Sequence, residues 1–513
     1  MMKHLEHDQT ERLKWSLICT CAVYLMAHGY RLFQAAFAGD GLLMIYKDDA
    51  AWEVALGRIV HPFLVLLRGG LEVPLLIGLL SALWLGLSVF LMTELLGITS
   101  RPVVALTAGI CVCNVTLTTT NGAYLFIADY YMLALFLAVC AAVLVWRCDT
   151  WWRIALAAVC IALSIGIYQA YICVTLGIIL FKVLFEGMPG PGRVMRMAIP
   201  FAAGGGAYYI AWRLAQRVLH IWTADGYNGM AGLTDYSGVS PAGLVLETYR
   251  RFFGYFMDPE VFVTYSYHGA KLSILWVWIV RLCNVSAAAV LIWYVITLAI
   301  TGKKTDPRRT ITALICLLLM PMALNIICFI TKGMEHSLMI YAFVLVYVGA
   351  LRAGQELGRL DRRIPGGWLC QRLSIILMVP VLWVQLVYAH QFYLKLELMD
   401  RAAQSVLTRI AVQVEAMPGY VPGQTPVAFA GIFESSPYLA SLEMFDEVNP
   451  LGVGKSIMPY GGTPERYMSN VLNIQMDFTD VDAQDSTVAL MPCFPEQGSI
   501  AWVGDTIVVK LSE

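Results

Sequence analysis

Charged residues are scarce in this 513-residue chain. Asp, Glu, Lys and Arg make up 14% of it, whereas hydrophobic residues make up 59%. A soluble domain usually has about 25% charged residues. One soluble core could not bury so much apolar surface, so the composition excludes an ordinary soluble protein. It indicates an α-helical polytopic membrane protein whose solvent is mostly the bilayer.

Motifs of several function classes are also missing. The net charge is −1 and there is no Lys/Arg-rich tract, so we expect no nucleic-acid partner. There is no Walker loop and no kinase signature, which argues against nucleotide-driven chemistry. The run Gly204-Gly205-Gly206 lies within an apolar segment and predicts close helix packing rather than phosphate binding.

Cysteine is plentiful, but only Cys493 lies outside the apolar part of the chain and its borders. A lone cysteine cannot form an internal disulfide in the C-terminal region. Cys111 and Cys113 lack the second ligand pair that a zinc site needs. The sequence therefore predicts no cofactor, and it leaves a metal requirement open.

Apolar runs of spanning length predict about eleven transmembrane helices. They lie near residues 15–38, 72–96, 102–120, 124–146, 153–167, 170–186, 195–214, 273–300, 310–330, 335–351 and 372–392. Lys and Arg concentrate in the short loops on the side of the N-terminus. By the positive-inside rule the N-terminus is cytoplasmic, and an odd number of spans places the C-terminus outside.

We expect two domains. Residues 1–392 form a transmembrane domain with long outside loops at 39–71 and 214–271, and residues 393–513 form a small α/β extracytoplasmic domain. The second domain should open with an amphipathic helix over 394–417. Strand-like runs follow at Pro426–Phe433, Thr487–Leu490 and Ile500–Leu511.

The first outside loop carries adjacent carboxylates, Asp48 and Asp49, just before a predicted membrane-surface helix that Pro62 kinks or restarts. A loop aspartate commonly caps a helix, and Asp49 is placed to do so. The alternative is a general base at the membrane surface, which is typically worth ~10²–10⁴ in rate.

Other polar residues gather on the same predicted side of the membrane. On the surface helix they are Arg58, His61 and Arg68, which could hold either a phosphate or lipid headgroups. Within or beside spans they are Asn121, Asp129, Tyr168, Gln169, Lys332, Glu335 and His336. Polar groups at membrane depth are costly, so they indicate a functional site, with helix-packing pairs as the alternative.

The stretch from Asp48-Asp49 to Gly57-Arg58 resembles the O-antigen glucosyltransferases, the serotype-converting membrane enzymes. Asp129, Tyr168-Gln169-Ala170 and the polar residues 332–336 are also similar to that family, which in turn is similar to other GT-C glycosyltransferases. The resemblance implies an inverting transfer of a sugar, with glucose the expected one, from a polyprenyl-phosphate donor to a lipid-linked or surface polysaccharide.

The resemblance also implies residue roles. Asp48 or Asp49 would be the base, and Arg58, Lys332 and His336 would hold the donor phosphate. The enzyme would lie in the bacterial cytoplasmic membrane and act on its periplasmic face. Besides membrane lipids, its pathway partners would be a donor-making synthase and a flippase. Two other functions fit an outward-facing membrane protein: an O-antigen polymerase or ligase, and a lipid-linked sugar flippase or transporter.

Overall fold

The computed structural model describes residues 2–34, 36–37, 39–43, 50–69, 72–221, 240–257, 274–302, 307–360, 366–436, 453–454, 456–458, 461–482 and 484–513. Asp48 and Asp49 lie outside these residues, so their predicted role is not addressed by the geometry. Over the described residues the chain is mostly helical, with one small sheet near the C-terminus.

The bundle begins with α1 (Met2–Leu32), followed by the short helices α2 (Gly39–Leu43), α3 (Ala50–Ala55) and α4 (His61–Arg68). The next helices are α5 (Pro74–Leu96), α6 (Arg101–Val112), α7 (Val115–Ala123), α8 (Ala128–Trp146), α9 (Trp151–Ile167), α10 (Ile172–Glu186) and α11 (Pro191–Leu219). The remainder are α12 (Pro241–Met257), α13 (Ile274–Gly302), α14 (Pro307–Leu324), α15 (Ile326–Ile330), α16 (Val344–Arg359), α17 (Gly367–Ile376) and α18 (Met378–Glu415).

Six helical segments of the described chain are long and apolar enough to cross a membrane, or seven if the bent pair α6–α7 forms one span. Their ranges are Pro74–Leu96, Leu125–Trp146, Gln169–Glu186, Leu275–Thr301, Pro307–Leu324 and Gly367–Glu415. The chain therefore has the helices of a membrane protein, and the count of eleven spans stays a prediction. Several predicted spans are shorter or interrupted: Asn325 separates α14 from α15, and residues 337–343 form 3₁₀ turns before α16.

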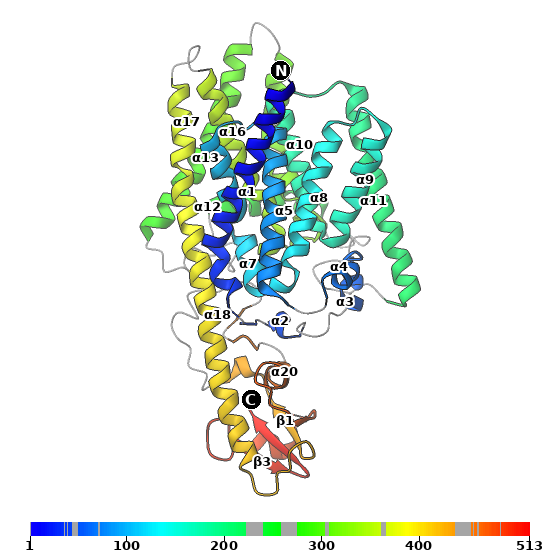
Figure 1. The fold of residues 1–513 in the computed structure, drawn as a ribbon, viewed down its shortest axis with the longest axis vertical. Helices are drawn as coiled ribbons and strands as arrows, with labels where there is room; N and C mark the ends of the chain where they lie inside the picture. The colour runs from blue at the N-terminus through cyan, green and yellow to red at the C-terminus, as the bar shows by residue number, and fades with distance from the viewer. Residues whose placement is uncertain are drawn as a thin grey trace.

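The two ends of the bundle differ (Figure 1). The N-terminus lies at one end, and the short helices α2, α3 and α4 lie at the other, on the side of the C-terminal sheet. Helix α18 joins the two parts: its 38 residues span roughly 57 Å at 1.5 Å per residue, which exceeds the ~30 Å hydrocarbon layer. The predicted boundary at residues 392–393 falls inside this continuous helix.

The C-terminal sheet has the order β2-β1-β4-β3, with β1 (Pro426–Ala430), β2 (Asp477–Phe478), β3 (Ile500–Val503) and β4 (Thr506–Lys510). β1 pairs in parallel with β2 and β4, and β3 pairs antiparallel with β4. The prediction of a strand at Thr487–Leu490 is wrong, because these residues lie in helix α21 (Ser486–Leu490). The Asp485 side chain caps that helix by accepting from the amides of Thr487 and Val488.

The C-terminal part also contacts the first loop of the bundle. Helix α20 (Thr463–Asn470) packs against α2, and Figure 1 shows α20 directly beside α2. The Tyr467 hydroxyl donates to Asp400 Oδ1 of α18 at 2.8 Å. These contacts hold α20 of the C-terminal part against both α2 and α18.

Close packing within the bundle relies on glycine at several crossings. A Cβ at Gly349 would lie 2.1 Å from the Phe181 ring, and one at Gly122 would lie 2.2 Å from the Phe392 ring. The predicted packing role of the glycine run is confirmed at Gly204, where a Cβ would lie 2.6 Å from the backbone oxygen of Ala158, but it is wrong at Gly205 and Gly206, where a Cβ would meet nothing within 4 Å.

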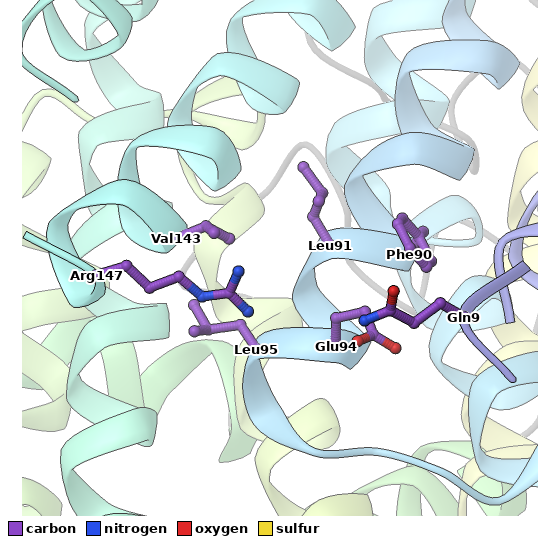
Figure 2. Close-up of a pocket in the computed structure, with 7 residues that line it drawn as sticks. All are labelled: Gln9, Phe90, Leu91, Glu94, Leu95, Val143 and Arg147. Atoms are coloured by element: carbon purple, nitrogen blue, oxygen red, sulfur yellow. The ribbon is translucent and has the colours of Figure 1, made fainter. Parts of the chain in front are cut away.

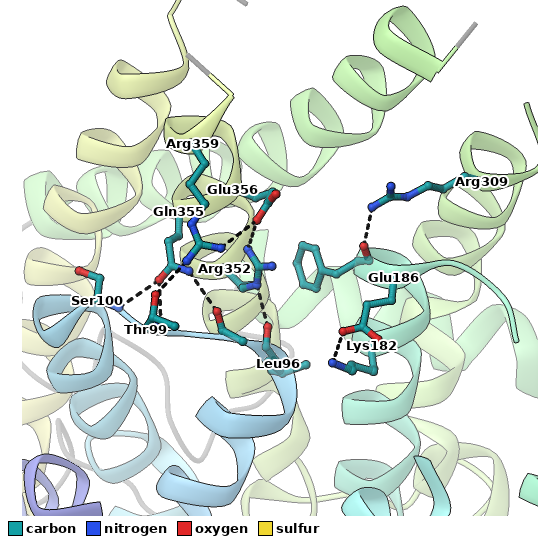
Figure 3. Close-up of polar contacts among 12 residues, drawn as sticks. Leu96, Thr99, Ser100, Lys182, Glu186, Arg309, Arg352, Gln355, Glu356 and Arg359 are labelled. Carbon is teal, nitrogen blue, oxygen red and sulfur yellow. Dashed lines mark hydrogen bonds and ion pairs between the residues drawn. The ribbon is translucent and has the colours of Figure 1, made fainter. Parts of the chain in front are cut away.

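The end with the N-terminus is built differently from the end with the sheet. A cavity lies there between α1, α5 and α8 (Figure 2). Beside it, side chains of α16 cap the connection between α5 and α6 (Figure 3). Arg352 Nε donates to the Leu96 carbonyl at 2.7 Å, and Gln355 Nε2 donates to the Gly97 carbonyl at 3.1 Å. The carbonyls at the end of α5 therefore have protein partners.

Candidate functional site

The segment from α3 to α4 forms two short helices, so of the two outcomes expected at Pro62 the helix restarts there. Gly57 has φ = 81°, in the left-handed region that favours glycine, and it ends the first helical segment. Pro62 then sits in the first turn of α4, where its missing amide hydrogen costs nothing. Because of this turn, the side chains of Glu53 and Arg58 face each other.

This turn is held against the bundle by hydrogen bonds from α9, α11 and the connection after α9. The amide of Val60 donates to the Gly166 carbonyl at 3.0 Å, and Trp212 Nε1 donates to the Val54 carbonyl at 2.9 Å. Gln169 Nε2 donates to the Leu56 carbonyl at 2.8 Å. The predicted site residue Gln169 therefore positions the turn through its amide.

Arg58 is the centre of the site. Its Nη1 lies 3.1 Å from Glu53 Oε2 and 3.3 Å from Oε1, and the Glu53 residue is 2% exposed. The guanidinium also lies over the rings of Tyr168, at 5.2 Å, and Tyr131, at 6.0 Å. These rings stack on each other with centroids 4.2 Å apart. Buried ion pairing and cation–π contact together fix the position of Arg58.

Two further titratable groups lie within the electrostatic reach of Arg58. Asp40, on α2, is mostly buried, and burial raises its pKa while Arg58 lowers it and Glu53 raises it again. His336, from the loop before α16, also feels the charge of Arg58. The structure thus brings residues 40, 53, 58 and 336 together from three segments: α2, the α3–α4 segment and the loop before α16.

A second ion pair lies next to the first. Arg68 Nη1 lies 2.6 Å from Asp129 Oδ1, Nη2 donates to the Phe126 carbonyl at 2.5 Å, and the guanidinium lies 4.3 Å from the Tyr130 ring centroid. His61 links the two pairs, because its Nδ1 lies 3.9 Å from Glu53 Oε2 and its ring meets Tyr130 edge-on at 5.2 Å. We call Asp40, Glu53, Arg58, His61, Arg68 and Asp129 the loop-one charge network.

The remaining predicted residues lie elsewhere. Asn121 is 1% exposed and accepts a hydrogen bond of 2.5 Å from the Tyr24 hydroxyl inside the bundle, so its side chain serves helix packing. Glu335 lies against α12: Asn325 Nδ2 donates to it at 3.3 Å, and it feels the charge of Arg251. Lys332 has φ = 53° and immediately precedes Gly333 in the same loop.

Sequence reasoning missed Asp40 and Glu53. Asp40 follows a glycine at the start of a loop, where an aspartate commonly serves only as a cap. Glu53 stands five residues before Arg58, a spacing that a continuous helix would not bring together. The signal available in the sequence was Gly57, whose permissive backbone allows the turn that brings the two together.

The Arg68–Asp129 pair yields a stability prediction. Both side chains are buried, at 8% and 4% exposure. Arg68→Gln leaves a buried carboxylate unpaired and should lower the free energy of unfolding by ~3–5 kcal/mol, whereas Arg68→Gln with Asp129→Asn should lose less. Arg250→Gln, which breaks an exposed pair with Glu247, is the matched control and should cost at most ~1 kcal/mol.

Unfolding of the purified variants in detergent measures these differences. If the single Arg68 variant were as stable as the double variant, the pair would not hold the network together.

Two kinds of known protein match this chain: a solved structure and a sequence family. Among solved structures, the chain is similar to the Archaeoglobus fulgidus oligosaccharyltransferase in complex with Zn and sulfate, at 10% sequence identity and a TM-score of 0.36. The match covers 87% of this chain but 62% of that one, so the chain spans less than two thirds of its length. A likeness of this size decides neither fold nor activity. No curated protein matches the chain.

The family comparison is more specific. Residues 29–351, more than half of the chain, match the family model described as Glucosyl transferase GtrII. The matched range contains every residue of the loop-one charge network and the loop at 332–336. The chain therefore belongs to the GtrII glucosyl transferase family.

Proposed function

We propose that the chain is a GT-C glycosyltransferase that moves a sugar from a polyprenyl-phosphate donor to a lipid-linked or surface polysaccharide such as O-antigen. Glucose is the expected sugar, in keeping with the family description. The proposed site is the end of the bundle beside the C-terminal domain, on the periplasmic face of the bacterial cytoplasmic membrane.

The observation that carries the proposal is the surroundings of Arg58. A fixed guanidinium and several carboxylates occur together where the first loop meets the ends of the bundle helices. Transfer from a phosphate-linked sugar needs both: a cation to hold the departing phosphate and a carboxylate to accept the proton of the attacking hydroxyl.

The proposed reaction is one inverting displacement. The acceptor oxygen bonds to the anomeric carbon while the bond from that carbon to the phosphate oxygen breaks, and polyprenyl phosphate leaves with the electron pair. A carboxylate takes the hydroxyl proton. We assign this role to Asp48 or Asp49, and the structure adds Asp40 as a third candidate because its raised pKa suits a base.

Arg58, His336 and Lys332 are our candidates for the donor phosphate. Burial, and secondarily the charge of Arg58, lower the pKa of His336 to about 4, so His336 would contact the phosphate as a neutral imidazole while Arg58 supplies the positive charge. Arg68 is less suited, because its guanidinium is committed to Asp129 and the Phe126 carbonyl. The exposed Phe63, Leu66 and Leu67 of α4 support a position of this loop at the membrane surface.

We further propose that the C-terminal domain supports the acceptor or covers the site, since α20 packs on the helix that carries Asp40. The N-terminus would be cytoplasmic. No cofactor is proposed, and the described residues contain no group of three or more His, Cys, Asp or Glu placed to hold a metal. A donor-making synthase and a flippase would supply the lipid-linked sugar on the outer face.

A transfer assay tests the base assignment. The purified chain, supplied with polyprenyl-phosphate glucose and acceptor polysaccharide, should release polyprenyl phosphate and form a product of inverted anomeric configuration. Asp48→Asn or Asp49→Asn should lower kcat by ~10²–10⁴ if that residue is the base. Asp485→Asn, in the distant α21 cap, is the control and should keep full transfer. Full transfer by all three of the Asp40, Asp48 and Asp49 variants would refute a base in this loop.

The pH profile identifies which carboxylate acts. Asp40 as base gives a rate that rises with pH through its raised pKa, because only the ionised form accepts a proton. Glu53→Gln removes a charge that raises this pKa, so the acidic limb of kcat/KM should move to lower pH. Arg58→Gln should move it to higher pH. If the acidic limb of kcat/KM moved in neither variant, Asp40 would be excluded as the base, and Asp48 or Asp49 would remain.

A further inference from the structure

The cavity at the end with the N-terminus lies away from the loop-one charge network and has no part in the proposed reaction. Its volume is about 200 Å³. Phe90, Leu91 and Leu95 of α5 and Val143 of α8 give it an apolar wall, and Gln9, Glu94 and Arg147 supply polar groups. It lies where α5 and α8 both end, and the ends of membrane-crossing helices are expected at the boundary with water.

Arg147 is the distinctive residue of this cavity. Figure 2 shows its side chain extending from the end of α8 toward α5, with Glu94 and Gln9 on the far side. Among the residues that the structure describes, its guanidinium has no ion pair, although neighbouring arginines do. Arg12 pairs with Glu94 at 2.7 Å, and Arg153 pairs with Asp149 at 3.0 Å.

The charge balance of the cavity favours an anion. The Glu94 carboxylate is already neutralised by Arg12, so the Arg147 charge remains in excess. Backbone carbonyls at the nearby helix ends would repel an anion if they were unpaired, but they accept hydrogen bonds from protein side chains. The Leu96 and Gly97 carbonyls accept from Arg352 and Gln355 (Figure 3), and the Trp146 carbonyl accepts from Arg193.

We propose that this cavity binds the phosphate of an anionic membrane lipid, which Arg147 holds while the adjoining chain rests on Phe90, Leu91 and Val143. A guanidinium matches phosphate oxygens through paired hydrogen bonds. A volume of about 200 Å³ admits a phosphate and the first carbons of a lipid, not the whole molecule. The lipid tails would continue along α5 and α8 in the bilayer.

Native mass spectrometry of the full chain in detergent tests this site, with phosphatidylglycerol, phosphatidylcholine and inorganic phosphate as separate probes. The wild-type chain should retain one more tightly bound phosphatidylglycerol than Arg147→Gln. Arg196→Gln is the matched control: Arg196, near the start of α11, is an exposed cation like Arg147 but does not line the cavity, so its loss should leave retention unchanged.

A second variant fills the cavity without altering charge. Val143→Phe should also abolish retention of the extra lipid. This result would show that the lipid needs the cavity, and that electrostatic attraction to Arg147 alone does not hold it. Unchanged retention in Arg147→Gln, or equal loss in Arg196→Gln, would overturn the proposal. Displacement of the bound lipid by inorganic phosphate alone would also overturn it. Because this cavity is separate from the transfer site, the result does not depend on the proposed function.

Discussion

A guanidinium that leaves water must be paired, and this requirement organises the first loop of the protein. Arg58 pairs with Glu53 within the loop, whereas Arg68 reaches Asp129 at the start of α8. The second pair fastens the loop to the bundle, and the first keeps a cation beside the aromatic rings of Tyr168 and Tyr131. Removing one partner of either pair would leave an uncompensated charge, so loop and bundle depend on each other.

The same requirement explains why the two ends of the molecule differ. At the end near the sheet, carboxylates and arginines from α2, α3, α4 and α8 meet in one network. At the other end, arginines cap helix carbonyls, as Arg352 does with Leu96, or form separate pairs, as Arg12 of α1 does with Glu94 of α5. A network that joins distant segments holds groups ready for chemistry, whereas local caps only complete helix ends.

Much of the helical frame follows from the sequence, because apolar runs of spanning length have few other uses. The pairing of Glu53 with Arg58 could not be predicted, since it depends on a left-handed Gly57 that breaks the helical spacing. The role of Asn121 does not follow from its position for another reason: a polar residue at membrane depth can also accept a hydrogen bond from a neighbouring tyrosine hydroxyl, as Asn121 does from Tyr24. The run Thr487–Leu490 is too short for its pattern to separate strand from helix, and the Asp485 cap decides it.

The central claim is that the lipid-linked donor binds at the loop-one charge network. Photo-crosslinking with a polyprenyl-phosphate sugar that carries a reactive group near the phosphate tests it most directly. After digestion, labelled peptides should come from residues 50–69 and from the loop around 332–336. Labelling confined to residues 90–101 or 143–153, at the opposite end of the bundle, would contradict the account.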